Sequence, residues 1–139
     1  MTSSFESDYY IFVLVASLGV IQIAASVGRL TGLLIVKSPI VVRTVGAALI
    51  VVAFVWFFDP DTRNINDYEG GLDGNFQALY FALGAASAFL ATVVLTSLIN
   101  VRMTAPKAAP RHGLDALRHT TYFRALSSSL RLGWRQWRR

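Results

Sequence analysis

Three long stretches of this sequence contain almost only apolar residues, and short polar segments separate them. The first runs from Tyr9 to about Gly28, the second from Ile40 to Phe58 and the third from Phe76 to Val101. A helix of about 20 apolar residues, rising about 1.5 Å per residue, crosses a hydrocarbon core about 30 Å thick. We therefore predict an all-α integral membrane protein with transmembrane helices over about 9–28, 40–58 and 76–101.

A shorter apolar piece, Leu30–Val36, follows the first run after Arg29. The first helix can continue past Arg29 into the membrane interface, because a long arginine side chain can keep its charge at the headgroups. Pro39 is expected to mark the turn, since proline cannot continue a helix from the preceding turn.

The polar segments define the remaining organisation around a three-helix transmembrane domain over 9–103. Residues 1–8 form an N-terminal segment, 59–75 an acidic loop, 104–113 a linker and 114–139 a basic tail. The N-terminal segment is acidic where a signal peptide is basic, so we expect the first apolar run to be kept as a span.

Charge is distributed unevenly along the chain. Twelve of the thirteen Lys and Arg residues lie around the connection between the first two runs or after the third run. Seven of the eight acidic residues lie in 1–8 and 59–75. Cytoplasmic loops carry the excess of Lys and Arg, so the N-terminus is predicted outside and the C-terminus in the cytoplasm of a plasma or inner membrane.

The tail predicts an amphipathic helix on the cytoplasmic side. At helical spacing, one face gathers Tyr122, Phe123, Leu126, Leu130, Trp134 and Trp137. A neighbouring face gathers Arg124, Arg131, Arg135 and Arg138. Such a helix suits a membrane surface with anionic lipid headgroups, and a soluble protein partner is the alternative. Basic and aromatic residues segregate by face instead of interleaving, which disfavours nucleic acid.

Small residues recur at helical spacing in the first and third runs. The candidate packing residues are Ala24, Gly28 and Gly32, Ala78, Ala82 and Ala86, Gly84 and Ala88, together with the polar Gln22. Small side chains let helix backbones approach closely in lipid, and Gln22 can hydrogen-bond to a neighbouring helix. These rows either pack the three helices on one another or dock against a different subunit.

Reactive chemistry is sparse. The central part of each span has no ionisable residue, the chain has no cysteine, and no catalytic triad, phosphate loop or metalloprotease motif is present. We expect no enzyme activity, no metal and no cofactor. The alternatives are a lipid, quinone or pigment at the aromatic residues of the outer interface, and a cation at the acidic loop.

These features favour a non-catalytic accessory, scaffolding or anchoring subunit of a multisubunit membrane complex. Its partners would be other membrane subunits, anionic lipids and a soluble protein on either side. The alternative is a homo-oligomeric channel or small transporter, in which several copies form a pore that one copy lacks.

Overall fold

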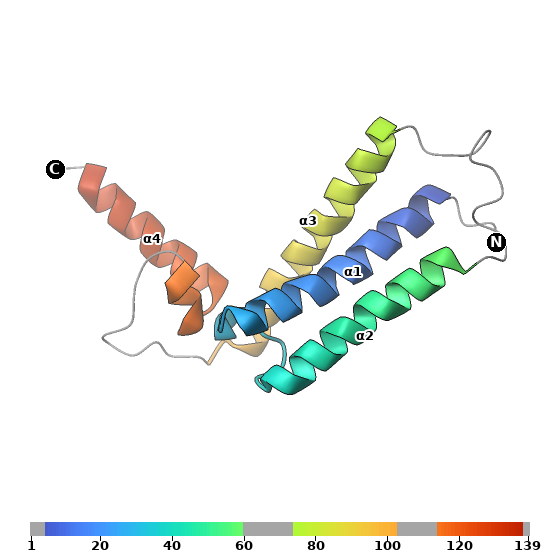
Figure 1. Cartoon of the computed structure of the whole chain (residues 1–139). Coiled ribbons are helices and arrows are strands. Elements are labelled where there is room, and N and C mark those ends of the chain that lie inside the picture. The colour runs from blue at the N-terminus through green and yellow to red at the C-terminus, as the bar shows by residue number, and fades with distance from the viewer. Residues whose placement is uncertain (1–4, 60–73, 103–113, 138–139) are drawn as a thin grey trace. The chain divides into compact units, whose positions relative to one another are not determined.

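The computed structural model describes residues 5–59, 74–102 and 114–137, which are mostly helical (Figure 1). No strand occurs within these three ranges, so the described part is all-helical as predicted. The elements in chain order are α1 (Phe5–Val27), the 3₁₀ helix η1 (Thr31–Leu33), α2 (Pro39–Phe58), α3 (Gly74–Ile99), the 3₁₀ helix η2 (Leu114–Arg118) and α4 (Tyr122–Trp137).

Three of these helices, α1, α2 and α3, are long and apolar enough to cross a membrane by length and composition. Only 28%, 22% and 22% of their most apolar windows are buried inside the chain. Large apolar side chains are usually buried in a water-soluble fold, whereas lipid is an apolar solvent for them. The described residues thus contain three candidate membrane spans, which indicates a membrane protein.

The helix boundaries differ from the predicted ones by a few residues. α1 begins at Phe5 instead of Tyr9, and Glu6 and Asp8 lie in its first turn, where carboxylates interact favourably with the helix dipole. α2 begins at Pro39, because proline is well tolerated at the first helical position. α3 covers 74–99 instead of 76–101.

α1 ends at Val27, close to the predicted end at about 28, and does not extend past Arg29, an extension that the sequence left open. Arg29 has a φ of 55°, and its N–H donates to the Ser26 carbonyl at 3.2 Å. The Leu30 N–H donates to the Ala25 carbonyl at 2.9 Å. This pair of bonds around a left-handed residue is the Schellman motif, which ends a helix and satisfies its last carbonyls. Arg29 adopts the conformation that glycine usually supplies there.

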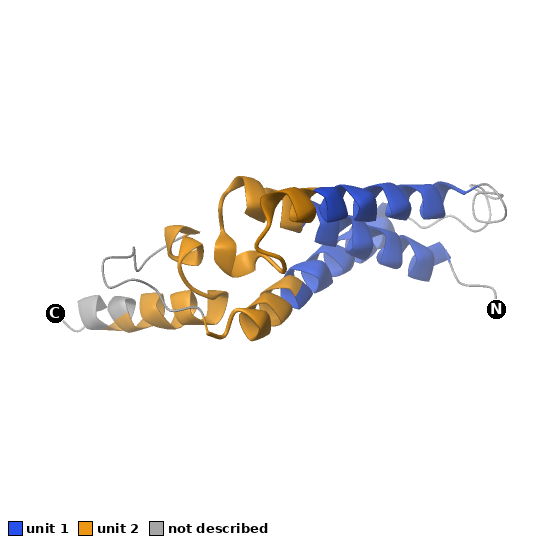
Figure 2. Ribbon diagram, turned by 90° about the horizontal axis from the view of Figure 1, so that it is seen from below, with its two compact units in different colours: residues 1–21, 44–91 blue, residues 22–43, 92–139 orange. Residues whose placement is uncertain are grey.

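The described chain divides into two compact units (Figure 2). Unit 1 comprises residues 1–21 and 44–91, and unit 2 comprises residues 22–43 and 92–139. Each long helix contributes one part to each unit. The tail elements η2 and α4 belong to unit 2, together with one end of each long helix.

Unit 1 packs through aromatic rings and glycines. The Phe12 ring stacks on Phe57 with centroids 4.5 Å apart and meets Phe54 edge-on at 5.0 Å. A Cβ at Gly19 would lie 2.9 Å from Ile50 Cγ1 and closer still to the Gly46 carbonyl oxygen. α1 and α2 therefore approach so closely here that no side chain fits at Gly19.

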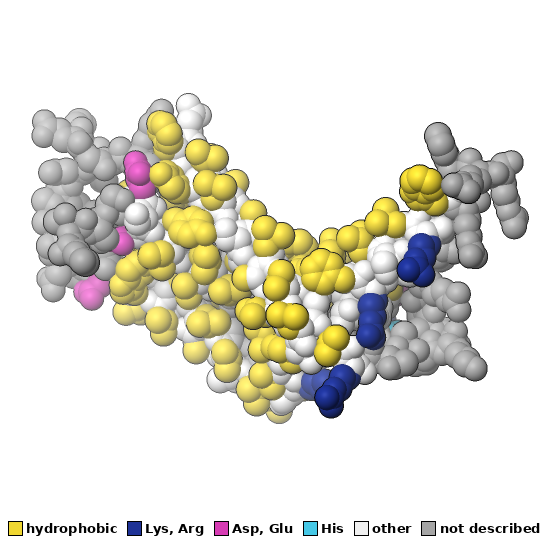
Figure 3. Space-filling model, turned by 180° about the vertical axis from the view of Figure 1, so that it is seen from behind, with side chains coloured by type: hydrophobic (Ala, Val, Ile, Leu, Met, Phe, Trp, Pro, Cys, Tyr) yellow, Lys and Arg dark blue, Asp and Glu magenta, His cyan; other side chains and the backbone are white. Residues whose placement is uncertain are grey.

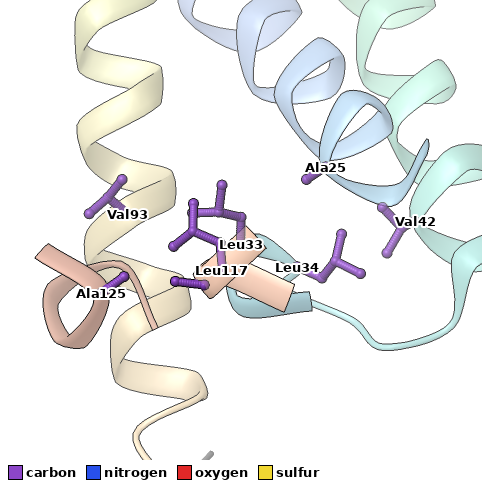
Figure 4. Packing of buried hydrophobic residues seen from close by; sticks show 8 residues of the cluster. Ala25, Leu33, Leu34, Val42, Val93, Leu117 and Ala125 are labelled. Carbon is purple, nitrogen blue, oxygen red and sulfur yellow. The ribbon is translucent and has the colours of Figure 1, made fainter. Parts of the chain in front are cut away.

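Unit 2 contains a compact apolar core in which side chains from helix ends and from the tail meet (Figure 4). The core residues are Ala25, Leu33, Leu34, Val42, Val93, Ala116, Leu117 and Ala125. Leu33 and Leu117 lie close together in the middle of this view. Residues of the α1–α2 connection and of η2 thus share one core.

Candidate functional site

The base of the tail docks on the α1–α2 connection within unit 2. η1 packs against η2, and the Thr31 hydroxyl donates a hydrogen bond to the Arg118 carbonyl at 2.6 Å. A Cβ at Gly32 would lie 2.8 Å from the Leu117 carbonyl oxygen and closer still to that of Thr120. Only glycine fits between the two segments, so this contact, which we call the η1–η2 latch, depends on Gly32.

The connection itself is held by two buried amides. Gln22 Nε2 donates to the Leu33 carbonyl at 3.2 Å, and Gln22 Oε1 accepts from the Ile35 N–H at 3.2 Å. Asn100 Nδ2 donates to the Leu34 carbonyl at 3.0 Å. Non-helical backbone lacks internal hydrogen-bond partners, and burying it unpaired is costly. Gln22 thus hydrogen-bonds to the connection that follows its own helix, whereas the sequence suggested a bond to a neighbouring helix.

α4 presents three faces. Ala125 is buried in the unit 2 core, and Thr121 just before the helix is buried as well. A second face is apolar and exposed, with 52% of Phe123, 43% of Leu126, 58% of Leu130 and 68% of Trp134 accessible. α4 is strongly amphipathic, unlike α1, α2 and α3.

The third face of α4 is basic. Arg124 and Arg131 are exposed, and no acidic residue occurs in 119–139. Basic side chains lie along one edge of the α4 arm in Figure 3, and hydrophobic side chains lie along another. The acid nearest along the chain, Asp115, pairs with Arg118 at 3.4 Å.

A groove of about 240 Å³ extends the apolar face of α4 onto η2. Its lining includes Leu114 and Leu117 of η2 and Tyr122, Ala125, Leu126 and Ser129 of α4. Leu114 is 70% exposed. The apolar surface therefore runs from the latch outward along the helix.

Unit 1 contains a hollow of about 430 Å³ with an almost entirely apolar lining. Its walls come from α1, α2 and α3 and include Phe12, Val13, Ser17, Phe54 and Phe81. Phe12 and Phe81, two of the aromatic residues that the sequence predicts at the outer interface, line it. The lining suits an apolar chain or ring, and the side chain of Ser17 contributes a hydroxyl group to it.

The structure distributes the predicted packing residues between buried and exposed positions. Gly84 and Ala88 are buried, and a Cβ at Gly84 would lie 3.0 Å from Val13. Ala78, Ala82 and Ala86 are exposed, and so is Ala24. Gly28 and Gly32 lie after the end of α1, so they form no helical row with Ala24.

The predicted tail residues are placed in part. Phe123, Arg124, Leu126, Leu130, Arg131 and Trp134 are exposed, and Tyr122 is half-buried. The side chains of Arg135 and Trp137, and the whole of Arg138, lie outside the described residues. The acidic loop proposed as a cation site also lies outside them, apart from Asp59, Gly74 and Asn75.

Sequence reasoning missed the Gly19–Gly46 approach and the buried role of Asn100. A glycine in the middle of a predicted span was the available signal, because glycine inside a helix costs about 1 kcal/mol relative to alanine and needs a packing reason. Asn100 gave a weaker signal, since its position at a helix end is equally typical of an exposed residue.

In the ranges that the structure describes, no three His, Cys, Asp or Glu side chains gather as metal ligands would. No known protein family, curated protein or solved structure matches this chain. The chemistry of its own surfaces is therefore the basis for assigning a role.

Proposed function

We propose that this chain is a non-catalytic accessory, scaffolding or anchoring subunit of a larger multisubunit membrane complex. It crosses a plasma or inner membrane three times through α1, α2 and α3, with its basic tail on the cytoplasmic membrane surface. The observation that carries the proposal is the exposed row of Ala78, Ala82 and Ala86 on α3, in a chain whose spans bury little of their surface.

Close packing of small residues is a main source of helix association in lipid, because lipid supplies no hydrophobic force between helices. The second row of α3, Gly84 and Ala88, is already buried against the chain's own helices. The exposed row is a surface of the same chemistry on another face of α3. It suits a helix of a partner subunit.

Orientation follows from the separation of charge. Described acids of unit 1 are Glu6, Asp8 and Asp59, whereas Lys37, Arg43 and Arg131 are among the basic residues of unit 2. The positive-inside rule assigns the basic side to the cytoplasm. The N-terminus is then extracytoplasmic.

Gentle detergent extraction tests the subunit proposal. The chain should run in a particle much larger than 15.3 kDa together with other polypeptides. Ala82→Leu should release it from the particle, while Ala47→Leu, the same change at an exposed alanine of α2, should not. A stable wild-type monomer contradicts the proposal, and a particle made only of copies of this chain supports a homo-oligomeric channel or transporter instead.

Cysteine labelling tests the orientation, because the chain has no cysteine of its own. Asp59→Cys and Lys37→Cys are exposed positions on opposite predicted sides. A membrane-impermeant maleimide should label Asp59→Cys in intact cells and Lys37→Cys only after permeabilisation. Labelling of both in intact cells contradicts the assigned topology.

A further inference from the structure

The apolar face of α4 cannot turn toward the core of unit 2. That direction is taken by Ala125, which is 7% exposed and belongs to the core cluster. Phe123, Leu126, Leu130 and Trp134 lie within an arc of about 80° on a different side of the helix. Docking through Ala125 therefore holds four large apolar side chains at the surface.

The charges beside this face are of one sign. Arg124 and Arg131 lie two turns apart on the same flank, next to the apolar arc. The segment 119–139 contains no acid and five arginines, so the surface complements a negative partner. A helix with an apolar face and flanking arginines lies in the plane of a membrane interface, with its arginines at the phosphate groups.

The apolar face of α4 also starts close to the connection between α1 and α2. Through the groove beside Leu126, this apolar face continues to Leu114 of η2. η2 in turn packs on η1, which follows α1 and precedes α2 in the sequence. The η1–η2 latch thus ties the base of α4 to the connection between two candidate spans. We infer that α4 binds the surface of an anionic phospholipid leaflet, with Phe123, Leu126, Leu130 and Trp134 among the acyl chains and Arg124 and Arg131 on the phosphates.

This inference rests on the proposed function, in which the tail lies on the cytoplasmic membrane surface. It adds the ligand, an acidic phospholipid, and the residues that select it. Each arginine near an anionic leaflet favours binding about fivefold, so neutral lipid should hold α4 much more weakly.

Fluorescence of the full chain in vesicles tests it. Trp56→Phe and Trp137→Phe leave Trp134 as the single emitter. This protein is reconstituted in phosphatidylcholine alone or with about 30% phosphatidylglycerol, a charge density typical of anionic leaflets. Quenching by lipids brominated on their acyl chains reports insertion, and quenching by aqueous acrylamide reports exposure to water.

The expected result is strong bromolipid quenching in anionic vesicles and at least about twofold weaker quenching in neutral ones. Arg124→Gln with Arg131→Gln should lower quenching in anionic vesicles toward the neutral value. Lys37→Gln with Arg102→Gln, which removes the same charge outside α4, should leave it unchanged. Helix content by circular dichroism verifies that all variants are folded.

Equal quenching in the two lipid compositions overturns the selection of acidic phospholipid. Strong acrylamide quenching in anionic vesicles overturns lipid binding altogether. Protection of Trp134 from both quenchers also overturns it and assigns the face to a protein contact. The vesicles contain no partner subunit, so this measurement can fail while the large particle and the opposite-side labelling still support the proposed function.

Discussion

Unit 1 and unit 2 share the same three long helices but are stabilised by different interactions. Unit 1 packs mainly through rings and at glycines, as in the Phe12–Phe57 stack and at Gly19, and it also contains side-chain hydrogen bonds such as Tyr10–Ser87. In unit 2 several polar side chains are buried, and those of Gln22, Thr96 and Asn100 bond to backbone groups. The buried polar residues of unit 2 are Gln22, Ser26, Thr92, Thr96, Asn100 and Thr121, against Asp8 in unit 1.

The reason for the difference is where the helices end. An intact helix satisfies its own backbone, so only shape must match between neighbours, and rings and glycines suffice. Unit 2 contains the connection between α1 and α2, whose N–H and C=O groups need other partners. Gln22 and Asn100 supply them. Two of the buried polar side chains of unit 2, Gln22 and Asn100, are therefore bonded to the interrupted backbone.

The largest effect is expected at the η1–η2 latch. Gly32→Val places carbon atoms into the Leu117 and Thr120 carbonyl groups, which should lower the free energy of unfolding by about 3 kcal/mol. Hydrogen exchange should accelerate in η2 and α4 and stay slow in α1 near Val13. Gly74→Val is the matched control, since nothing lies within 4 Å of that position. Unchanged exchange in α4 contradicts a latch.

The counterpart in unit 1 is Gly19→Ala. Its Cβ meets Ile50 and the Gly46 carbonyl, so α1 and α2 must separate, at a cost of about 2 kcal/mol. Exchange should accelerate in these two helices while α4 keeps its protection. If α4 loosens to the same extent, the two units do not open independently and the comparison between them breaks down.

A smaller loss is expected for Gln22→Leu. It keeps the side chain's bulk but leaves the Leu33 carbonyl and the Ile35 N–H without their side-chain partner, at a cost of about 1–2 kcal/mol. Thermal unfolding in detergent micelles followed by circular dichroism measures it. Gln77→Leu, at an exposed position of α3, should change stability by less than about 0.5 kcal/mol. Equal losses in both variants contradict the role of Gln22.

The smallest effect is expected for a hydrogen bond between two side chains of unit 1. Tyr10→Phe removes the 2.8 Å bond to the Ser87 hydroxyl and keeps the ring. Bonds of this kind between helices in lipid contribute about 0.6 kcal/mol. A double-mutant cycle with Ser87→Ala isolates the pair. A coupling energy above that of the Gln22 interactions shows that unit 1 also depends on polar contacts.

Much of the fold was predictable because it follows from local composition. The three apolar runs predicted α1, α2 and α3 to within a few residues, and the all-helical fold followed from them. α1 begins at Phe5, earlier than the predicted Tyr9, because Glu6 and Asp8 are favourable in the first turn of a helix. The end of α1 depended on a left-handed Arg29, which no propensity predicts for arginine.

The site was less predictable. The latch joins Gly32 to residues more than 80 positions later, as the Thr31–Arg118 bond shows, and no local pattern links them. Gln22 was predicted to hydrogen-bond to a neighbouring helix, and in the structure its amide bonds to the Leu33 carbonyl and the Ile35 N–H of the connection. The fold brings Gln22 to the connection, because the backbone groups that it bonds there have no helical partner of their own.

The sequence by itself determined the features that depend on polarity. These are the segments that suit hydrocarbon, the regions where positive charge gathers, and the faces of the tail helix. Only the tertiary structure decided that Gly84 and Ala88 are buried while Ala78, Ala82 and Ala86 are exposed. The physical reason is that α1, α2 and α3 are apolar on every side. Polarity cannot select the buried face of such helices, so the size and shape of the side chains select it.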